Sequence, residues 1–176
     1  MAIMQPKEFI RTVFMTETSQ IVNTNPYISS MIIGIGIEFL GKCIDTSEQD
    51  WNKRNRSSKH FNLAIKRLVS FAKYKPYLNT YKLYDSFRCG LVHAASPKYL
   101  VTLSSKNEAP NLIVRGNRLN FRIEDLYQDF YNACNEVINM TFTDNDKMNL
   151  PFLQVPVIYN DANSIAASGS TSAAQP

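Results

Sequence analysis

The stretch Met31-Ile-Ile-Gly-Ile-Gly-Ile-Glu-Phe-Leu40 is the most apolar run of the chain, and one acid, Glu38, interrupts it. A membrane-spanning helix needs about 20 apolar residues, roughly twice the length of this run. We therefore expect no membrane insertion and predict a helix buried in a protein core. It extends from Tyr27 to about Ile44, because Asn25-Pro26 breaks the pattern before it.

Apolar residues recur at helical spacing on both sides of this run. Further helices are predicted from about 6 to 22, from 57 to 74 with Ser57 or Ser58 as cap, from 79 to before Pro97, and from 123 to 140. Between the last two, short apolar runs at 99–103, 112–114 and 119–121 are typical of β-strands. The expected fold class is mainly α: an up-and-down helical bundle with a small inserted β-hairpin or three-strand element before the last helix.

The chain has 176 residues, 44% of them hydrophobic and 19% charged, which is typical of one globular domain. We expect residues 1–150 to form the helical domain, with the β insertion at 98–122. Residues 151–176 end in a stretch rich in Ala, Ser, Gly and Thr that lacks the apolar side chains of a core. This C-terminal tail is predicted to be extended and disordered.

The three cysteines, Cys43, Cys89 and Cys134, lie far apart and form no C-x-x-C pair. An odd number without such spacing predicts neither a disulfide framework nor a zinc ribbon, and favours reduced thiols. Residues Met1 to Phe9 lack the apolar core of a secretory signal. Together these features predict a cytoplasmic protein.

The net charge of +4 is an average over unequal segments, because residues 51–84 contain no Asp or Glu and nine of the nineteen basic residues. Aromatic residues are interspersed among these cations. Cations for phosphates and rings for base stacking are the components of a single-stranded nucleic-acid site. The alternative is a solvated helix face with ordinary core aromatics. The candidate nucleic-acid-binding residues are Lys53, Arg54, Arg56, Lys59, Lys66 and Arg67.

The segment Asp85-Ser-Phe-Arg-Cys-Gly-Leu-Val-His93 places an acid, an arginine, a thiol and an imidazole within nine residues. In a helix, Asp85, Cys89 and His93 line one face. Arg88 and His93 are about 140° apart around an ideal helix. A shared site would need a relaxed turn at Gly90, or two copies of the helix meeting across a dimer axis.

Several kinds of chemistry fit this segment. Arg88 could hold a phosphate while His93 moves a proton in phosphodiester cleavage. Cys89 could act as a nucleophile with His93 as its base. Cys89 and His93 could be metal ligands, completed by Cys43 and Cys134. In the structural alternative, Arg88 pairs with Asp85 or Glu38, and Glu38 needs such a counter-charge if it is buried.

Arg88-Cys-Gly-Leu-Val-His93 matches the R-x4–6-H motif of the HEPN superfamily, and its position late in a helix of an α-bundle also resembles that family. The resemblance covers residues from about 5 to 142. It implies an RNA-directed protein, either a metal-independent endoribonuclease or an RNA-binding module, that needs no cofactor and acts as a homodimer with two motifs facing each other. On that model Arg88 contacts the scissile phosphate. His93 handles protons while the ribose 2′-OH attacks, which leaves a 2′,3′-cyclic phosphate.

The chain departs from the family pattern at Cys89, where active members often carry Asn, Asp or His after the arginine. A thiol is a poor substitute for these hydrogen-bonding groups. The alternative is therefore a non-catalytic helical module that binds RNA or a protein partner. Many members of the superfamily act in bacterial defence or toxin–antitoxin systems, which would imply an antitoxin or another protein partner.

Overall fold

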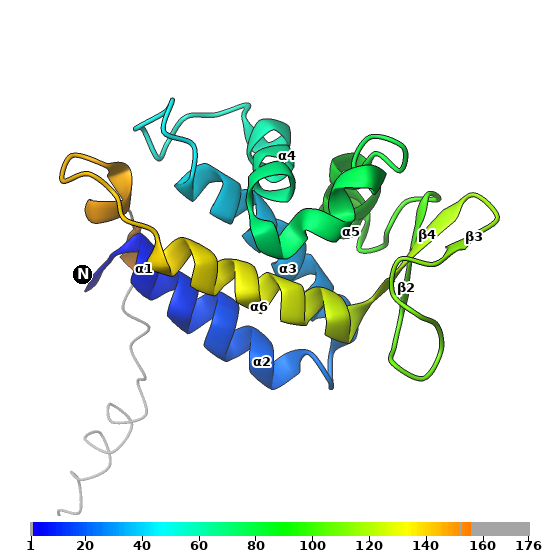
Figure 1. Cartoon of the computed structure of the whole chain (residues 1–176). Helices are drawn as coiled ribbons and strands as arrows, with labels where there is room; N and C mark the ends of the chain where they lie inside the picture. The colour runs from blue at the N-terminus through cyan, green and yellow to red at the C-terminus, as the bar shows by residue number, and fades with distance from the viewer. Residues whose placement is uncertain (1, 152, 156–176) are drawn as a thin grey trace, which may run out of the picture.

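The protein is mainly helical with a small three-stranded sheet at one end (Figure 1). The computed structural model describes residues 2–151 and 153–155. Its longest helices are α3 (Pro26–Cys43) and α6 (Ile123–Asn139). The first helical segment is continuous from α1 (Pro6–Phe9) through the wider turns of Ile10–Glu17 to α2 (Thr18–Ile21), and it lies alongside α6 (Figure 1). The helical class and the small sheet predicted from the sequence are thus confirmed.

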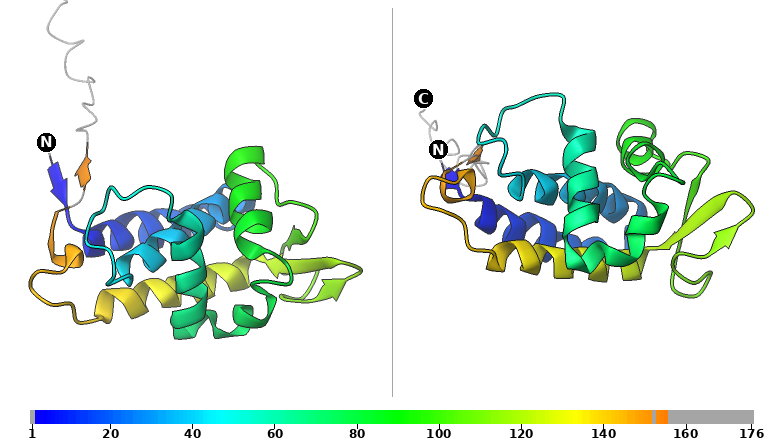
Figure 2. Two further views of the ribbon diagram at one scale, coloured as in Figure 1. Left: turned by 90° about the horizontal axis from the view of Figure 1, so that it is seen from above. Right: turned by 45° about the horizontal axis from the view of Figure 1, so that its top comes forward.

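Helix α4 (Ser57–Arg67) runs across α3 rather than along it (Figure 2). The two helices approach closely at Gly41, where a methyl group would overlap the backbone carbonyl of His60. At Gly36, α3 makes room in the same way for the ring of Phe130 on α6. Two glycines of α3 therefore bring both partner helices near its backbone.

The prediction of a helix from 57 to 74 was wrong beyond Arg67. Helix α4 ends there, and the buried Leu68 has extended backbone angles. A tighter 3₁₀ segment, Val69–Tyr77, follows. The Glu136 carboxylate of α6 accepts hydrogen bonds from the backbone N–H groups of Val69 and Ser70 at 3.0 and 3.2 Å. It satisfies the free donors of the new segment. The predicted Ser57 or Ser58 cap is also absent, since the position before the helix is Arg56 and no side chain caps it.

The motif helix starts at Tyr84 rather than at 79. Before it, Asn79–Lys82 form a tight turn in which Lys82 has a φ of +45°. The segment Tyr84–Cys89 has π-helical turns and continues without interruption into α5 (Gly90–Ala94). The spacing of an ideal helix therefore does not apply over its first half.

The sheet has the strand order β2–β4–β3. Strand β2 (Val101–Ser104) is parallel to β4 (Arg118–Arg122), with Val101 opposite Leu119. The short β3 (Val114–Arg115) forms an antiparallel hairpin with β4 through a turn at Gly116, whose φ is +58°. Buried Leu119 and Phe121 fix the sheet to the helices.

Residues 2–4 and 153–155 form a second, two-stranded sheet. Strand β1 (Ala2–Met4) pairs antiparallel with β5 (Leu153–Val155), which follows a short 3₁₀ turn at Lys147–Asn149. Apart from β5, most of the tail predicted to be disordered, 151–176, lies outside the described residues. Within the described part of the chain, no helix has both the length and the apolar character that crossing a bilayer requires.

Candidate functional site

The motif arginine is held by an acid of the central helix. The Nε atom of Arg88 lies 2.7 Å from Oε2 of Glu38 on α3, and both side chains are less than one-fifth exposed. The contact is an ion pair without hydrogen-bond alignment, because neither atom has a hydrogen-bond partner among the described residues. Gly34 on α3 lies beside the Arg88 backbone, where a methyl group would make only an ordinary contact, at 3.6 Å from the Arg88 Cα atom. The expected pairing of Glu38 with Arg88 is confirmed.

Two further residues of the motif helix, Tyr84 and Cys89, lie near this ion pair. We call Glu38, Tyr84, Arg88 and Cys89 the Arg88 cluster. The Arg88 guanidinium lies 5.8 Å from the centre of the Tyr84 ring, a cation–π distance. Burial raises the pKa of Tyr84, and its hydrogen bond with the Cys89 thiol raises it further. Cys89 therefore interacts with Tyr84 inside the cluster rather than standing free.

The other two candidate residues lie outside this cluster. Asp85 is exposed, and its carboxylate lies 2.6 Å from Nζ of Lys98, so it does not face Arg88. His93 is exposed in the last turn of α5. No hydrogen bond or ion pair joins His93 to Arg88 or Cys89 in the described part of the chain. Within one copy of the protein, Arg88 and His93 therefore do not form a shared site.

The remaining cysteines are core residues. Cys43 and Cys134 are buried, and burial raises the pKa of both thiols. Cys89 is only half-buried, on the motif helix. Among the described residues, no three His, Cys, Asp or Glu side chains come together as ligands for one metal ion.

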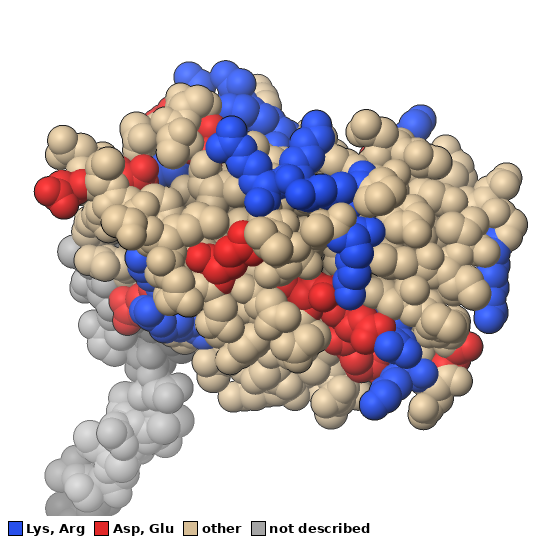
Figure 3. Space-filling model, viewed as in Figure 1, with Lys and Arg blue, Asp and Glu red and all other residues tan. Residues whose placement is uncertain are grey.

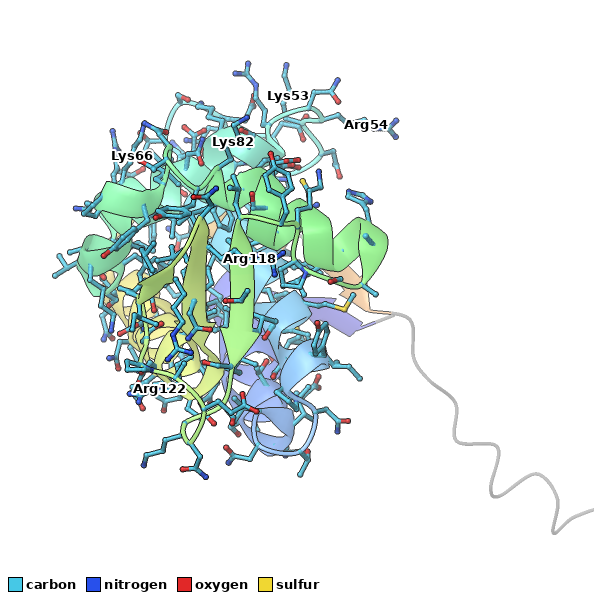
Figure 4. All side chains as sticks on the ribbon, turned by 90° about the vertical axis from the view of Figure 1, so that its right-hand side faces the viewer. Lys53, Arg54, Lys66, Lys82, Arg118 and Arg122 are labelled. Carbon is cyan, nitrogen blue, oxygen red and sulfur yellow. The ribbon has the colours of Figure 1, made fainter. Side chains whose placement is uncertain are left out.

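The predicted nucleic-acid-binding residues lie on the loop before α4 and on α4 itself, and all six are exposed. Figure 3 shows Lys and Arg side chains gathered over this part of the molecule. In Figure 4, Lys53, Arg54 and Lys66 point outward at the same end of the molecule as Lys82, a further cation of the acid-free segment. We call the surface formed by residues 51–56, α4 and the turn at Lys82 the basic face.

Lys59 differs from the other five. Its Nζ lies 2.6 Å from Oδ2 of Asp45, so its charge is neutralised within the protein. Fewer aromatic residues of the acid-free segment are accessible for base stacking than the sequence predicted, since His60, Phe61 and Tyr74 are buried. For these rings, packing in the core replaces the base stacking expected from sequence.

Asp45 belongs to a buried charged cluster that sequence reasoning missed. It contains Asp45, Lys59, His60 and Lys147. Lys147 is 1% exposed, and its ammonium donates to the backbone carbonyls of Asp45, at 2.7 Å, and Glu48. Burial alone would raise the pKa of Asp45, but hydrogen bonds from Lys59 and Ser47 hold it well below its usual range. Burial lowers the pKa of His60, which favours the neutral imidazole.

Comparison with known proteins returned no match: no family model fits the chain, and no curated protein and no solved structure is detectably similar. The resemblance of the Arg88–His93 motif to the HEPN superfamily therefore stays a prediction.

Proposed function

We propose that this protein binds single-stranded RNA on the basic face. One observation carries the proposal: of the nine cations in residues 51–84, only Lys59 and Lys73 contact a carboxylate within the described part of the chain. The others face solvent with their charge uncompensated. Such cations bind backbone phosphates and displace condensed counterions, so affinity falls as salt rises.

The test is fluorescence anisotropy with a labelled 12-nucleotide RNA in EDTA, at salt concentrations from 50 to 200 mM. Lys66→Ala and Arg67→Ala should each weaken binding and reduce the slope of log affinity against log salt by about 0.7. Lys73→Ala is the matched control, because Nζ of Lys73 is already engaged by Asp129 at 2.7 Å. Binding that is absent or insensitive to salt overturns the proposal.

A second candidate function is metal-independent RNA cleavage by a homodimer, as the HEPN resemblance implies. It is favoured by an apolar stripe on α3, where the exposed Ile35 and Ile28 lie about one and about three helical turns before Glu38. Residues 28, 31, 35 and 38 follow helical spacing, so the stripe leads directly to the Arg88 cluster. A second copy packed on this stripe would bury it and place a second motif helix beside the first.

In such a dimer, Arg88 of one copy would hold the scissile phosphate and His93 of the partner copy would transfer protons. The ribose 2′-oxygen bonds to phosphorus and releases its proton, while the bond from phosphorus to the 5′-oxygen breaks and that oxygen gains a proton. The Glu38–Arg88 ion pair would have to open, since Glu38 occupies the side of the guanidinium that a phosphate needs.

Cleavage of RNA in EDTA tests this function. Arg88→Ala and His93→Ala should each abolish it in folded protein, whereas Asp85→Asn, on the exposed side of the same helix, should leave it intact. An equal mixture of the Arg88→Ala and His93→Ala proteins should regain cleavage that neither has alone, because one of the two sites in a mixed dimer is complete. Activity that survives either alanine variant, or a monomer in light scattering, overturns the cleavage proposal and leaves RNA binding to be judged separately.

A further inference from the structure

A pocket of about 250 Å³ lies between α4 and the turn that leads into the motif helix. Its walls include Asn62 of α4, Asn79 and Lys82 of the turn, and Tyr84, while the buried Leu78 contributes an apolar surface. Figure 4 shows Lys82 at the same outer edge of the molecule as Lys66. Asn62 and Lys66 are four residues apart on α4 and therefore share a face of that helix. The pocket thus opens within the basic face.

The two carboxamides of this pocket are available to a ligand. Among the described residues, neither the Asn62 nor the Asn79 side chain makes a hydrogen bond. Asn79 is exposed and Asn62 half-buried, both line the hollow, and each carboxamide carries a donor and an acceptor. An asparagine amide matches adenine, because it can pair with N6 and N7 of that base at once.

The cation of the pocket is held in an unusual backbone conformation. Lys82 has a φ of +45°, which lysine rarely adopts, and the turn around it is closed by hydrogen bonds from Lys82 N–H to the Asn79 carbonyl and from Leu83 N–H to the Leu78 carbonyl. Such backbone conformations persist where the surrounding structure imposes them, and they are frequent at sites that clamp a ligand. Lys82 is thereby placed at the mouth of the pocket.

The pocket also shares Tyr84 with the Arg88 cluster. Tyr84 contributes to the pocket wall and contacts the Arg88 guanidinium through its ring. A nucleotide in the pocket would therefore neighbour any phosphate held at Arg88. A larger hollow of about 640 Å³, lined by Ile44, Arg67 and Asp146 among others, includes no residue of the motif helix.

We infer that the pocket between Asn62, Asn79 and Lys82 binds one unpaired adenosine of the RNA, next to Arg88. The amides would read the edge of the base, Leu78 would contact its face, and Lys82 would neutralise its phosphate. This inference rests on the proposed RNA binding and adds a base preference to it.

The experiment compares two labelled RNAs by anisotropy: a 12-nucleotide oligo(U) and the same oligonucleotide with three adenosines. Both carry 2′-O-methyl groups, which remove the nucleophile and prevent cleavage. The full-length protein should bind the adenosine-containing RNA about tenfold more tightly. Asn62→Ala and Asn79→Ala should each abolish most of this preference by weakening the binding of the adenosine-containing RNA toward that of oligo(U).

Asn132→Ala is the matched control, because Asn132 is an exposed carboxamide on α6 that does not line the pocket. It should retain the preference, and circular dichroism should show the same unfolding midpoint for all three variants. Salt-dependent binding of both RNAs with equal affinity overturns the pocket assignment and leaves the proposed RNA binding standing. No binding of either RNA overturns the proposed function, and the pocket assignment with it.

Discussion

The buried charged cluster and the basic face contain the same kinds of cation in opposite situations. In the cluster, Lys59 and Lys147 each contact an acceptor of the segment that follows α3, and Lys147 is almost fully buried. On the basic face, Lys66 and Lys82 are exposed and contact no carboxylate within the described residues. We therefore expect the partner of a cation, rather than its position in a basic segment, to separate a structural role from the proposed binding role.

Two glycines of α3, one beside the buried charged cluster and one beside Arg88, differ in how closely they are packed, and they give the largest expected effect. A methyl group at Gly41 would overlap the His60 carbonyl beside the buried charged cluster, so Gly41→Ala should lower the free energy of unfolding by about 3 kcal/mol. At Gly34, beside Arg88, the methyl group would meet the Phe87 ring at an ordinary 3.5 Å. Gly34→Ala should leave stability unchanged or raise it by up to about 1 kcal/mol. Urea unfolding measures both, and similar losses would show that α3 does not approach α4 as described.

Removing the buried cation should cost almost as much. Lys147→Met keeps the length of the side chain but leaves the carbonyls of Asp45 and Glu48 without their donor. We expect a loss of about 3 kcal/mol in urea unfolding. Lys75→Met, at an exposed cation of the acid-free segment, should change stability by less than about 0.5 kcal/mol. Equal effects of the two substitutions would remove the contrast between the two regions.

The two histidines should differ in their contribution to pH dependence. His60 is buried with its pKa below the ordinary 6.5, so below that pH the unfolded chain binds a proton that the folded chain does not. Stability should therefore fall as the pH drops below 6.5, by about 1 kcal/mol per pH unit until the folded protein also takes up the proton. Asp45, whose folded pKa is depressed, loses its contribution only below about pH 4. His60→Gln should reduce the loss of stability between pH 6.5 and 5, measured by urea unfolding.

His93→Gln is the control for this measurement, because His93 is exposed at the end of α5. It should leave the loss between pH 6.5 and 5 in place. A loss that disappears in His93→Gln and persists in His60→Gln would contradict the assignment.

The smallest expected effect separates two lysines of the same helix. Lys59→Ala removes the partner of a nearly buried carboxylate and should lower stability by about 1 kcal/mol, with little change in RNA affinity. Lys66→Ala should do the reverse, weakening RNA binding without a measurable change in unfolding. Parallel urea unfolding and anisotropy titrations measure both quantities. If Lys59→Ala weakens RNA binding as much as Lys66→Ala does, the two regions act as one surface.

Local patterns predicted most of the helices and one essential contact. Apolar residues at helical spacing located α3 and α6 to within about one residue of their observed bounds. The same reasoning recognised that Glu38, an acid in an apolar helix, needed a cation, and Arg88 supplies it. These features depend on residues a few positions apart, or on the cost of burying one charge, and both can be evaluated from sequence.

The amino-acid sequence was thus enough to predict a helical protein with a small β element, an acid-free basic segment and an Arg–His motif on one helix. Only the tertiary structure decided that α4 stops at Arg67, because Glu136 from α6 caps the segment after it. It also paired the exposed Lys59 with the buried Asp45 and brought Asn62 and Asn79 to one pocket. Such contacts join residues far apart in the chain, and hydrophobic spacing specifies which face of a helix is buried but not which polar group it meets there.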